Sequence, residues 1–398
     1  MNISLSSLRI NCFNRSPFFT KSSLLSLKIQ KSSFNHFANS VFRISDSKNV
    51  VFEKTKFKNG LSNAVYLDSS NENLRIWNRQ IATENYATFF NSYFDRIESK
   101  DKNGSAIYST LGLDISNCIF NTIRGNTGAA IFNIGFLRLK YTTFAHCFAN
   151  FEADIRSVSV VPQSVIISNC IFTESHADRL FASFWISTYG DIIYSTCNNT
   201  NTIALHCVGV GQVNHGSFHL DHSNIVKTTS CYNGGLVAED IEKIFVDSVN
   251  FISNFQKSNV PESASAILIT NPAGNGHVQD CNFIENTNEQ GYVIYMQHLS
   301  LIVENCCFTK AKENREVNYQ VTMINSHIRK ICFNMTDMLN EGIGYFQPSH
   351  ILRKQRKDRN VSKSFLFSIL ASVLAVLIKF FWSNYARQYI FKNSKQLM

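Results

Sequence analysis

Two acidic residues, Asp221 and Asp247, recur 26 positions apart in matching sequence contexts, and His222 directly follows the first. If both acids point outward from adjacent parallel strands, they lie about 4.8 Å apart. Two carboxylates at that separation could shift each other's pKa, hold a cation, or act as the acid and base of a glycosidase. The other interpretation is a stacked acidic pair on a solvated face. Asp221, Asp247 and His222 are therefore the candidate catalytic residues of a polysaccharide lyase or glycosidase, although no Asn-Thr-Asp or Gly-His-Gly signature of polygalacturonases accompanies them.

Other patterns that could carry chemistry are incomplete. Gly209-Val210-Gly211 lacks the rest of a dinucleotide fingerprint and is predicted to be a turn. The eleven cysteines include no pair at the CxxC spacing of zinc sites, and the eleven histidines are scattered. We therefore expect no metal site and no cofactor.

The elements that would position the acids follow from a repeat that runs through most of the chain. Its template is apolar, any, apolar, any, any, small or apolar, any, aromatic, as in Leu113, Ile115, Cys118 and Phe120. Successive copies are about 27 residues apart, inside the range of solenoid repeats. The last template position falls at Ile10, Phe34, Phe57, Phe94, Phe120, Phe144, Phe172, Asn199, Ile225, Phe251, Phe283, Phe308 and Phe333.

Apolar residues two positions apart predict short strands with one buried face, and the extra residue between the two pairs predicts a bend. Another strand lies about eleven residues before the small-residue position, for example at 106–108 and 130–132. Several strands per repeat around one axis are typical of a right-handed parallel β-helix, here with about thirteen rungs. The longer step from Phe57 to Phe94 predicts an inserted loop around residues 69–73.

Stacked rungs place equivalent side chains in rows, which we expect to form three internal or bend ladders. Small apolar packing groups point inward at Cys118, Cys170, Cys281 and Cys306, and also at Cys197. Aromatic rings stack along the axis at Phe120, Phe144, Phe172, Phe251, Phe283 and Phe308. Amides satisfy backbone groups at the bends at Asn91, Asn117, Asn169 and Asn305, joined by Asp280.

The C-terminal region has the composition of a membrane anchor. Six of the basic residues behind the net charge of +9 gather in residues 353–363, which does not indicate a nucleic-acid surface. They directly precede Ser364 to Trp382, nineteen residues with a single charge at Lys379 that would span about 28 Å as a helix. The expected organisation is a β-helix domain at 1–335, a basic juxtamembrane linker at 336–363, a transmembrane helix at 364–382 and a tail at 383–398. The linker would contact anionic lipid headgroups.

Short tetrapeptides of the repeat resemble those of polymorphic outer membrane (Pmp-like) surface proteins, whose marks are GGAI and FxxN. Residues 128–131 read Gly-Ala-Ala-Ile, and residues 251–254 and 283–286 satisfy FxxN. The resemblance implies a pectin-lyase-like solenoid in a cell-surface protein that adheres to host or matrix protein or glycan. It extends over roughly residues 3–335, and no C-terminal barrel of the autotransporter type is recognisable.

Membrane orientation is left open between two alternatives. The first residues already fit the repeat and lack the apolar stretch of a signal peptide, and the basic residues before the apolar segment outnumber those in or after it. Both features favour a tail-anchored cytosolic protein, whereas the resemblance favours display at the cell surface, which we prefer. The predicted function is non-enzymatic binding or adhesion by a single-pass membrane protein, with the carbohydrate-active enzyme as the alternative.

Overall fold

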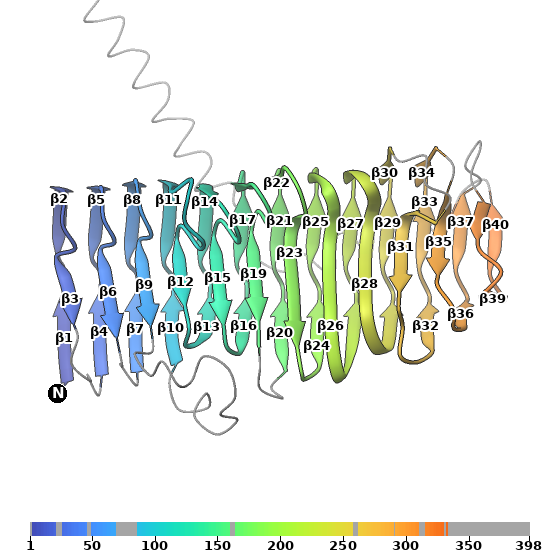
Figure 1. The fold of residues 1–398 in the computed structure, drawn as a ribbon, viewed down its shortest axis with the longest axis horizontal. Helices are drawn as coiled ribbons and strands as arrows, with labels where there is room; N and C mark the ends of the chain where they lie inside the picture. The colour runs from blue at the N-terminus through green and yellow to red at the C-terminus, as the bar shows by residue number, and fades with distance from the viewer. Residues whose placement is uncertain are drawn as a thin grey trace, which may run out of the picture. The chain divides into compact units, whose positions relative to one another are not determined.

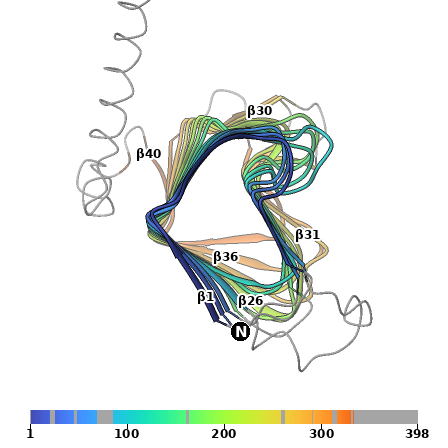
Figure 2. The same cartoon turned by 90° about the vertical axis from the view of Figure 1, so that its left-hand side faces the viewer.

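The computed structural model describes residues 2–20, 26–45, 49–68, 86–159, 164–257, 262–289, 291–309 and 315–329, together with Cys332. Every regular element in these residues is a β-strand, and every pair of neighbouring strands is parallel. The chain forms a right-handed parallel β-solenoid whose turns stack into a rod (Figure 1). Viewed along the rod, one corner of successive turns nearly superimposes, while the strands that lead to it fan out (Figure 2). The prediction of an all-β parallel β-helix is therefore confirmed.

The strands form three faces. The first face contains β1 (Asn2–Ser6), β4 (Ser26–Gln30), β7 (Asn49–Glu53), β10 (Tyr86–Phe90), β13 (Gly112–Ser116), β16 (Leu137–Lys140), β20 (Val165–Ser168), β24 (Ile192–Ser195), the ends of β26 (Ile203–Asp221) and β28 (Thr229–Asp247), β32 (Gly276–Gln279), β36 (Leu301–Glu304) and β39 (Val321–Ile324). The second face contains β2 (Arg9–Phe13), β5 (Ser33–Phe37), β8 (Lys56–Gly60), β11 (Tyr93–Glu98), β14 (Ile119–Gly125), β17 (Thr143–Ala145), β21 (Ile171–Thr173), β25 (Asn198–Thr200), β27 (Asn224–Val226), β29 (Asn250–Ile252), β33 (Asn282–Ile284), β37 (Cys307–Thr309) and β40 (His327–Arg329). Each of these two series holds thirteen strands, close to the predicted number of rungs.

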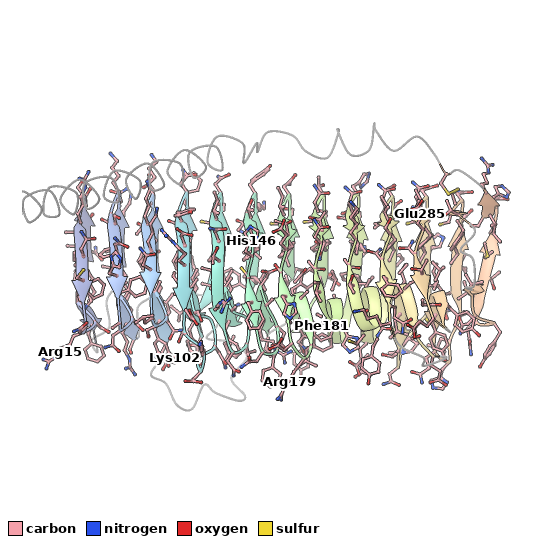
Figure 3. The ribbon with its side chains drawn as sticks, turned by 90° about the horizontal axis from the view of Figure 1, so that it is seen from above. Arg15, Lys102, His146, Arg179, Phe181 and Glu285 are labelled. Atoms are coloured by element: carbon pink, nitrogen blue, oxygen red, sulfur yellow. A yellow bond between two sulfur atoms is a disulfide. The ribbon has the colours of Figure 1, made fainter. Side chains whose placement is uncertain are left out.

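The third face is less regular, because β26 and β28 each pass around a corner. It contains β3 (Phe18–Thr20), β6 (Phe42–Ser45), β9 (Val65–Asp68), β12 (Ile107–Ser109), β15 (Ile131–Ile134), β19 (Ile155–Val158), β23 (Phe181–Thr188), the middle of β26 and β28, β31 (Ala264–Thr270), β35 (Tyr292–Met296) and β38 (Arg315–Val317). Short strands β18 (Phe148–Ala149), β22 (His176–Ala177), β30 (Phe255–Gln256) and β34 (Thr287–Asn288) lie between the second and third faces. In the view of Figure 3, Arg179 and Phe181 lie at the same edge of the rod.

The interior is a column of apolar side chains in register. Phe120 stacks on Phe94 and Phe144 with ring centroids 4.7 and 4.9 Å apart, and all three rings are fully buried. The column is interrupted at Asn199, which is also buried and donates a hydrogen bond from Nδ2 to Ser183 Oγ at 2.7 Å. Strand alternation explains the arrangement, because residues two apart share a face.

The bend after each first-face strand is made by a non-glycine residue in the left-handed region, with φ between 44° and 59°. These residues are Ser7, Lys31, Lys54, Asn91, Asn117, Tyr141, Asn169, Thr196, His222, Ser248, Asp280, Asn305 and Asn325. Asparagine tolerates this conformation better than most residues, which gives the bend asparagines a backbone role. A hydrogen-bonded amide ladder lies two residues later, where Asn224, Asn250 and Asn282 each donate to the preceding rung's asparagine at 2.6–2.9 Å, beginning at Asn198.

The cysteine position after the bend has a polar role as well as a packing role. The Cys118 thiol accepts a hydrogen bond from the Ser92 backbone N–H and donates to Ser116 O, at 3.4 and 3.3 Å. Serine hydroxyls make the equivalent contacts at Ser32 and Ser223. The buried cysteines therefore satisfy bend amides that water does not reach.

One disulfide joins Cys307, in the twelfth strand of the second face, to Cys332 just beyond the thirteenth. The sequence pattern did not indicate this bond. Cys281 and Cys306, on adjacent rungs, are free thiols, and the Cys281 backbone N–H donates to Cys306 Sγ at 3.4 Å.

Two predictions of position were wrong. The partner of Phe308 on the last rung is Ile328, 20 residues on, rather than Phe333, which lies outside the described residues. Gly209 lies inside β26 instead of a turn, and a Cβ there would come within 2.1 Å of the Phe181 ring. The strand needs glycine because a neighbouring aromatic ring occupies the space.

The inserted loop at 69–73 and the segment Ser364 to Trp382 also lie outside the described residues. Within the residues that are described, the structure contains no helix with the length and apolar character to cross a bilayer.

Candidate functional site

The candidate acids end two neighbouring strands of the first face. The register pairs Asp221 of β26 with Asp247 of β28, and Asp247 with Gln279 of β32. Each of the two acids directly precedes a left-handed bend, and His222 is the bend residue after the first. The two acids thus occupy the same outward position of consecutive turns.

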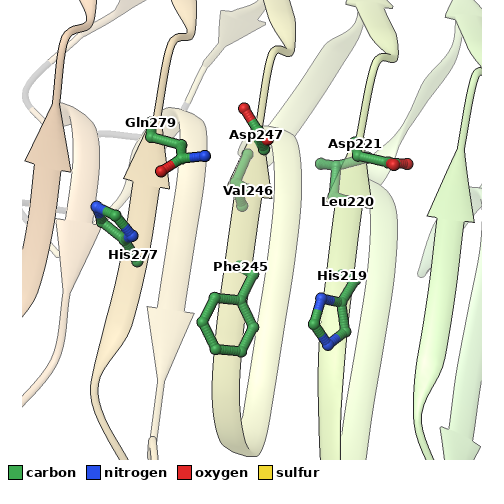
Figure 4. A pocket seen from close by; sticks show the side chains of 8 residues that line it. All are labelled: His219, Leu220, Asp221, Phe245, Val246, Asp247, His277 and Gln279. Carbon is green, nitrogen blue, oxygen red and sulfur yellow. The ribbon is translucent and has the colours of Figure 1, made fainter.

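The two carboxylates do not converge. In Figure 4 the Asp221 carboxylate points away from Asp247. Asp221 Oδ2 lies 3.6 Å from His222 Nδ1, while its Oδ1 is buried without a hydrogen-bond partner among the described residues. Asp247 Oδ1 accepts a hydrogen bond from Ser248 Oγ at 2.9 Å. Each carboxylate is engaged by its own bend, so shared proton or cation chemistry requires both side chains to rotate.

An open pocket of about 260 Å³ surrounds the acid pair. Its outward-facing lining consists of the two acids, Phe245, Gln279 and two histidines, His219 and His277, with Leu220 and Val246 behind them (Figure 4). The lining contains no lysine or arginine. These residues belong to three successive strands, so the strand register of the first face determines the shape of the pocket.

Phe245 and His219 form the aromatic wall of the pocket. Their rings stack with centroids 4.8 Å apart, and Phe245 remains 40% exposed. His219 Nε2 lies 2.7 Å from Ser217 Oγ, and Ser217 donates from both its backbone N–H and its hydroxyl to Asp191 Oδ1. These hydrogen bonds lower the pKa of Asp191. Because serine lies between the acid and the imidazole, these hydrogen bonds orient His219 and do not reproduce a Ser-His-Asp triad.

His277 continues the row of His219 and Phe245 on the next strand, β32, and its Nε2 lies 3.3 Å from Glu304 Oε2. Aromatic, amide and carboxylate groups in one shallow pocket suit a small polar ligand with an apolar side. No group of three or more His, Cys, Asp or Glu among the described residues has an arrangement that could hold a metal ion.

Comparison with protein-family models, with curated proteins and with solved structures finds no match to this chain. The relation to Pmp-like proteins therefore stays a resemblance between short motifs.

A second titratable cluster lies inside the solenoid, away from this pocket. Asp154 is fully buried, and its Oδ1 accepts a hydrogen bond from Ser175 Oγ at 2.8 Å, while Oδ2 has no partner among the described residues. Burial raises the pKa of Asp154 to about 8. Burial and the nearby Asp154 carboxyl raise the pKa of the Cys147 thiol well above its usual value. The acid inside the rod is thus neutral over much of the physiological range.

Sequence reasoning identified the acids but missed the other residues of the pocket wall. Phe245 and His219 lie two positions before Asp247 and Asp221, on the same outward side of their strands. Extending the alternation backward from the acids would have identified both. Gln279 and His277 required the register across the 32-residue step to the next turn.

Proposed function

We propose that this protein is a single-pass membrane protein whose β-solenoid is displayed at the cell surface and binds partners without catalysis. The observation that carries the proposal is the outer surface of the first face. It exposes a series of large apolar side chains among polar ones: Tyr86, Phe90, Ile193, Phe245, Ile302 and Ile324. Rows of exposed apolar residues rimmed by polar groups are typical of interaction surfaces.

One further feature supports display over a tail-anchored cytosolic orientation, although the basic run before the apolar segment favours the latter. A disulfide such as Cys307–Cys332 persists in oxidising compartments and is rare in the cytosol. The apolar segment Ser364 to Trp382, with the basic run before it, supplies an anchor and a contact for anionic lipid headgroups. Partners of such a rod are proteins or glycans of a host or matrix.

Protease protection on intact cells tests the orientation. The full chain carries one tag before Asn2 and another after residue 398. We expect protease to remove the first tag from intact cells and the second only after the membrane is opened. If both tags resist protease until the membrane is opened, the proposal of surface display is wrong.

The second candidate function is cleavage of a polysaccharide at Asp221 and Asp247. It is favoured by one observation, that the two acids stand side by side in a pocket with an exposed aromatic ring. The test incubates the full chain with neutral and acidic polysaccharides and follows new reducing ends or unsaturated products. Cleavage lost in Asp247→Asn supports the enzyme, and no cleavage by the unaltered protein rejects it for those substrates.

A further inference from the structure

The outward charge of the first face reverses along the rod. The second to sixth strands of this face and the bends after them present five bases and two acids, a net charge of +3: Lys28, Lys31, Lys54, Arg138 and Lys140 against Glu53 and Asp114. The eighth to twelfth strands are counted with the residue before each strand and the bend after it. They present five acids and one base, a net charge of −4 with histidines neutral: Asp191, Asp221, Asp247, Asp280 and Glu304 against Lys243. One face of a basic protein therefore has a positive half and a negative half.

The middle of this face is uncharged. The seventh of its thirteen strands is β20, which presents Ile166 between short polar residues, and the eighth presents Ile193, 36% exposed. Large aromatic rings lie on both sides of this centre, in adjacent outward rows of the face. Phe90 belongs to the fourth strand and Phe245 to the tenth, each three strands from β20, and they are 38% and 40% exposed.

A surface whose two halves are complementary about an uncharged centre fits a second copy of itself. A two-fold axis through Ile166 that runs along β20, in the plane of the face and perpendicular to the rod, brings the third strand of one copy against the eleventh of the other. Lys54 then faces the bend at Asp280, while Lys28 of the second strand faces Ile302 of the twelfth, one outward row from Glu304. A parallel arrangement would place each charged half against its like and be repelled.

We propose that two copies of this chain pair side by side and antiparallel through their first faces, with Ile166 at the two-fold axis. This inference deepens the proposed function, since it rests on the first face being a binding surface and names the partner. Each contact is then made twice, as in the isologous interfaces of most homodimers.

The first face is large enough for such a pair. Strands of about five residues are about 17 Å long, and strands are stacked about 4.8 Å apart. Seven central strands then give roughly 1,000 Å² buried on both copies together, and all thirteen give about twice that, which spans the range of stable dimers. Figure 2 shows the first-face strands fanning out between β1 and β36, so the face is twisted along the rod.

Cysteine cross-linking in the full chain tests both the pairing and its axis. The exposed Cys12 and Cys231 are first replaced by serine. Ile166→Cys is expected to cross-link to its own counterpart on oxidation. Val51→Cys and His277→Cys, each four strands from the axis, are the matched controls: neither should cross-link alone, and a mixture of the two should.

Exchanging the charges at two bends supplies an independent test. Bend positions of this face accept both lysine and aspartate, as Lys54 and Asp280 show, so Lys54→Asp and Asp280→Lys keep the local backbone. Each variant alone should dimerise about tenfold more weakly by sedimentation velocity at low salt, and mixing the two should restore the native affinity.

The pairing is refuted if Ile166→Cys does not cross-link, whether or not Val51→Cys cross-links to itself. Mixed charge variants that stay monomeric also refute it. If the chain is displayed but fails these tests, the proposed surface location stands and only the antiparallel pair is rejected. If the chain pairs but is not displayed, the pair stands and the surface location is rejected.

Discussion

Replacing the buried Asp154 with asparagine should remove a pH dependence from the stability of the rod. The folded-state pKa is about 8, against an ordinary value of 3.8. A pKa raised by folding contributes stability that is complete below pH 4 and is lost as pH rises through 8. Asparagine has the same shape and does not ionise, so the stability of the variant does not fall as pH rises through 8.

The magnitude follows from proton linkage. Between the two pKa values the free energy of unfolding falls by about 1.4 kcal/mol per pH unit, because the unfolded carboxyl releases a proton that the folded one retains. Between pH 5 and pH 8 the native chain therefore loses about 4 kcal/mol relative to Asp154→Asn. At pH 8 the variant should be the more stable of the two by several kcal/mol.

Urea unfolding followed by the fluorescence of Trp185 measures this difference. Trp185 packs against Arg156, two residues from the acid, and reports the same part of the rod. Trp77 and Trp382 are replaced by phenylalanine so that one tryptophan remains. Asp101→Asn, at an exposed turn, is the matched control and should follow the native curve.

Native and Asp154→Asn curves that stay parallel from pH 5 to pH 8 would show that folding does not raise the pKa of Asp154. A variant less stable than the native chain at pH 8 would show that the acid is ionised in the folded state and stabilised by a partner.

Three further outcomes are expected. His206 is largely buried and its pKa is lowered to about 4, so it contributes stability above pH 6.5 that is lost as pH falls toward 4; His206→Gln should remove up to about 3 kcal/mol of acid sensitivity in urea unfolding between pH 7 and pH 4. Phe120→Ala should cost about 3–5 kcal/mol in urea unfolding at pH 7, because it opens a cavity between two stacked rings, and a loss below 1 kcal/mol would contradict the packed interior. Cys118→Ala should cost about 1–3 kcal/mol by leaving the Ser92 N–H unpaired, whereas Cys118→Ser should keep both hydrogen bonds and most of the stability; equal losses would show that the thiol only fills space.

The fold could be predicted from the sequence because the same apolar alternation recurs in thirteen successive repeats. Leu113 and Ile115 pair with Leu137 and Leu139 as the apolar template implies. The last rung was misplaced because its step shortens to 20 residues, and Phe333 was the nearest aromatic residue to the expected spacing. A fixed period fails where the solenoid itself changes circumference.

The candidate site was predicted only in part. Asp221 and Asp247 were found because a repeat aligns them, but the direction of each carboxylate depends on its own bend at His222 or Ser248. The amide ladder starting at Asn198 was missed because four asparagines two residues after a bend look no different in sequence from those at the bend. The disulfide depended on Cys332, which follows the rung of irregular length.

The disulfide acquires a mechanical meaning from the direction of the backbone hydrogen bonds. Bonds between neighbouring rungs, such as Asn117 N to Lys140 O, run along the rod, so a pull from its ends loads one rung at a time and peels the terminal rung first. At the C-terminal end, β40 is the rung that tension from the following chain would reach first. Cys332 follows β40 and is bonded covalently to Cys307 of β37, the strand beneath it. The disulfide carries a force applied there directly to the twelfth rung, so the last rung is not peeled away.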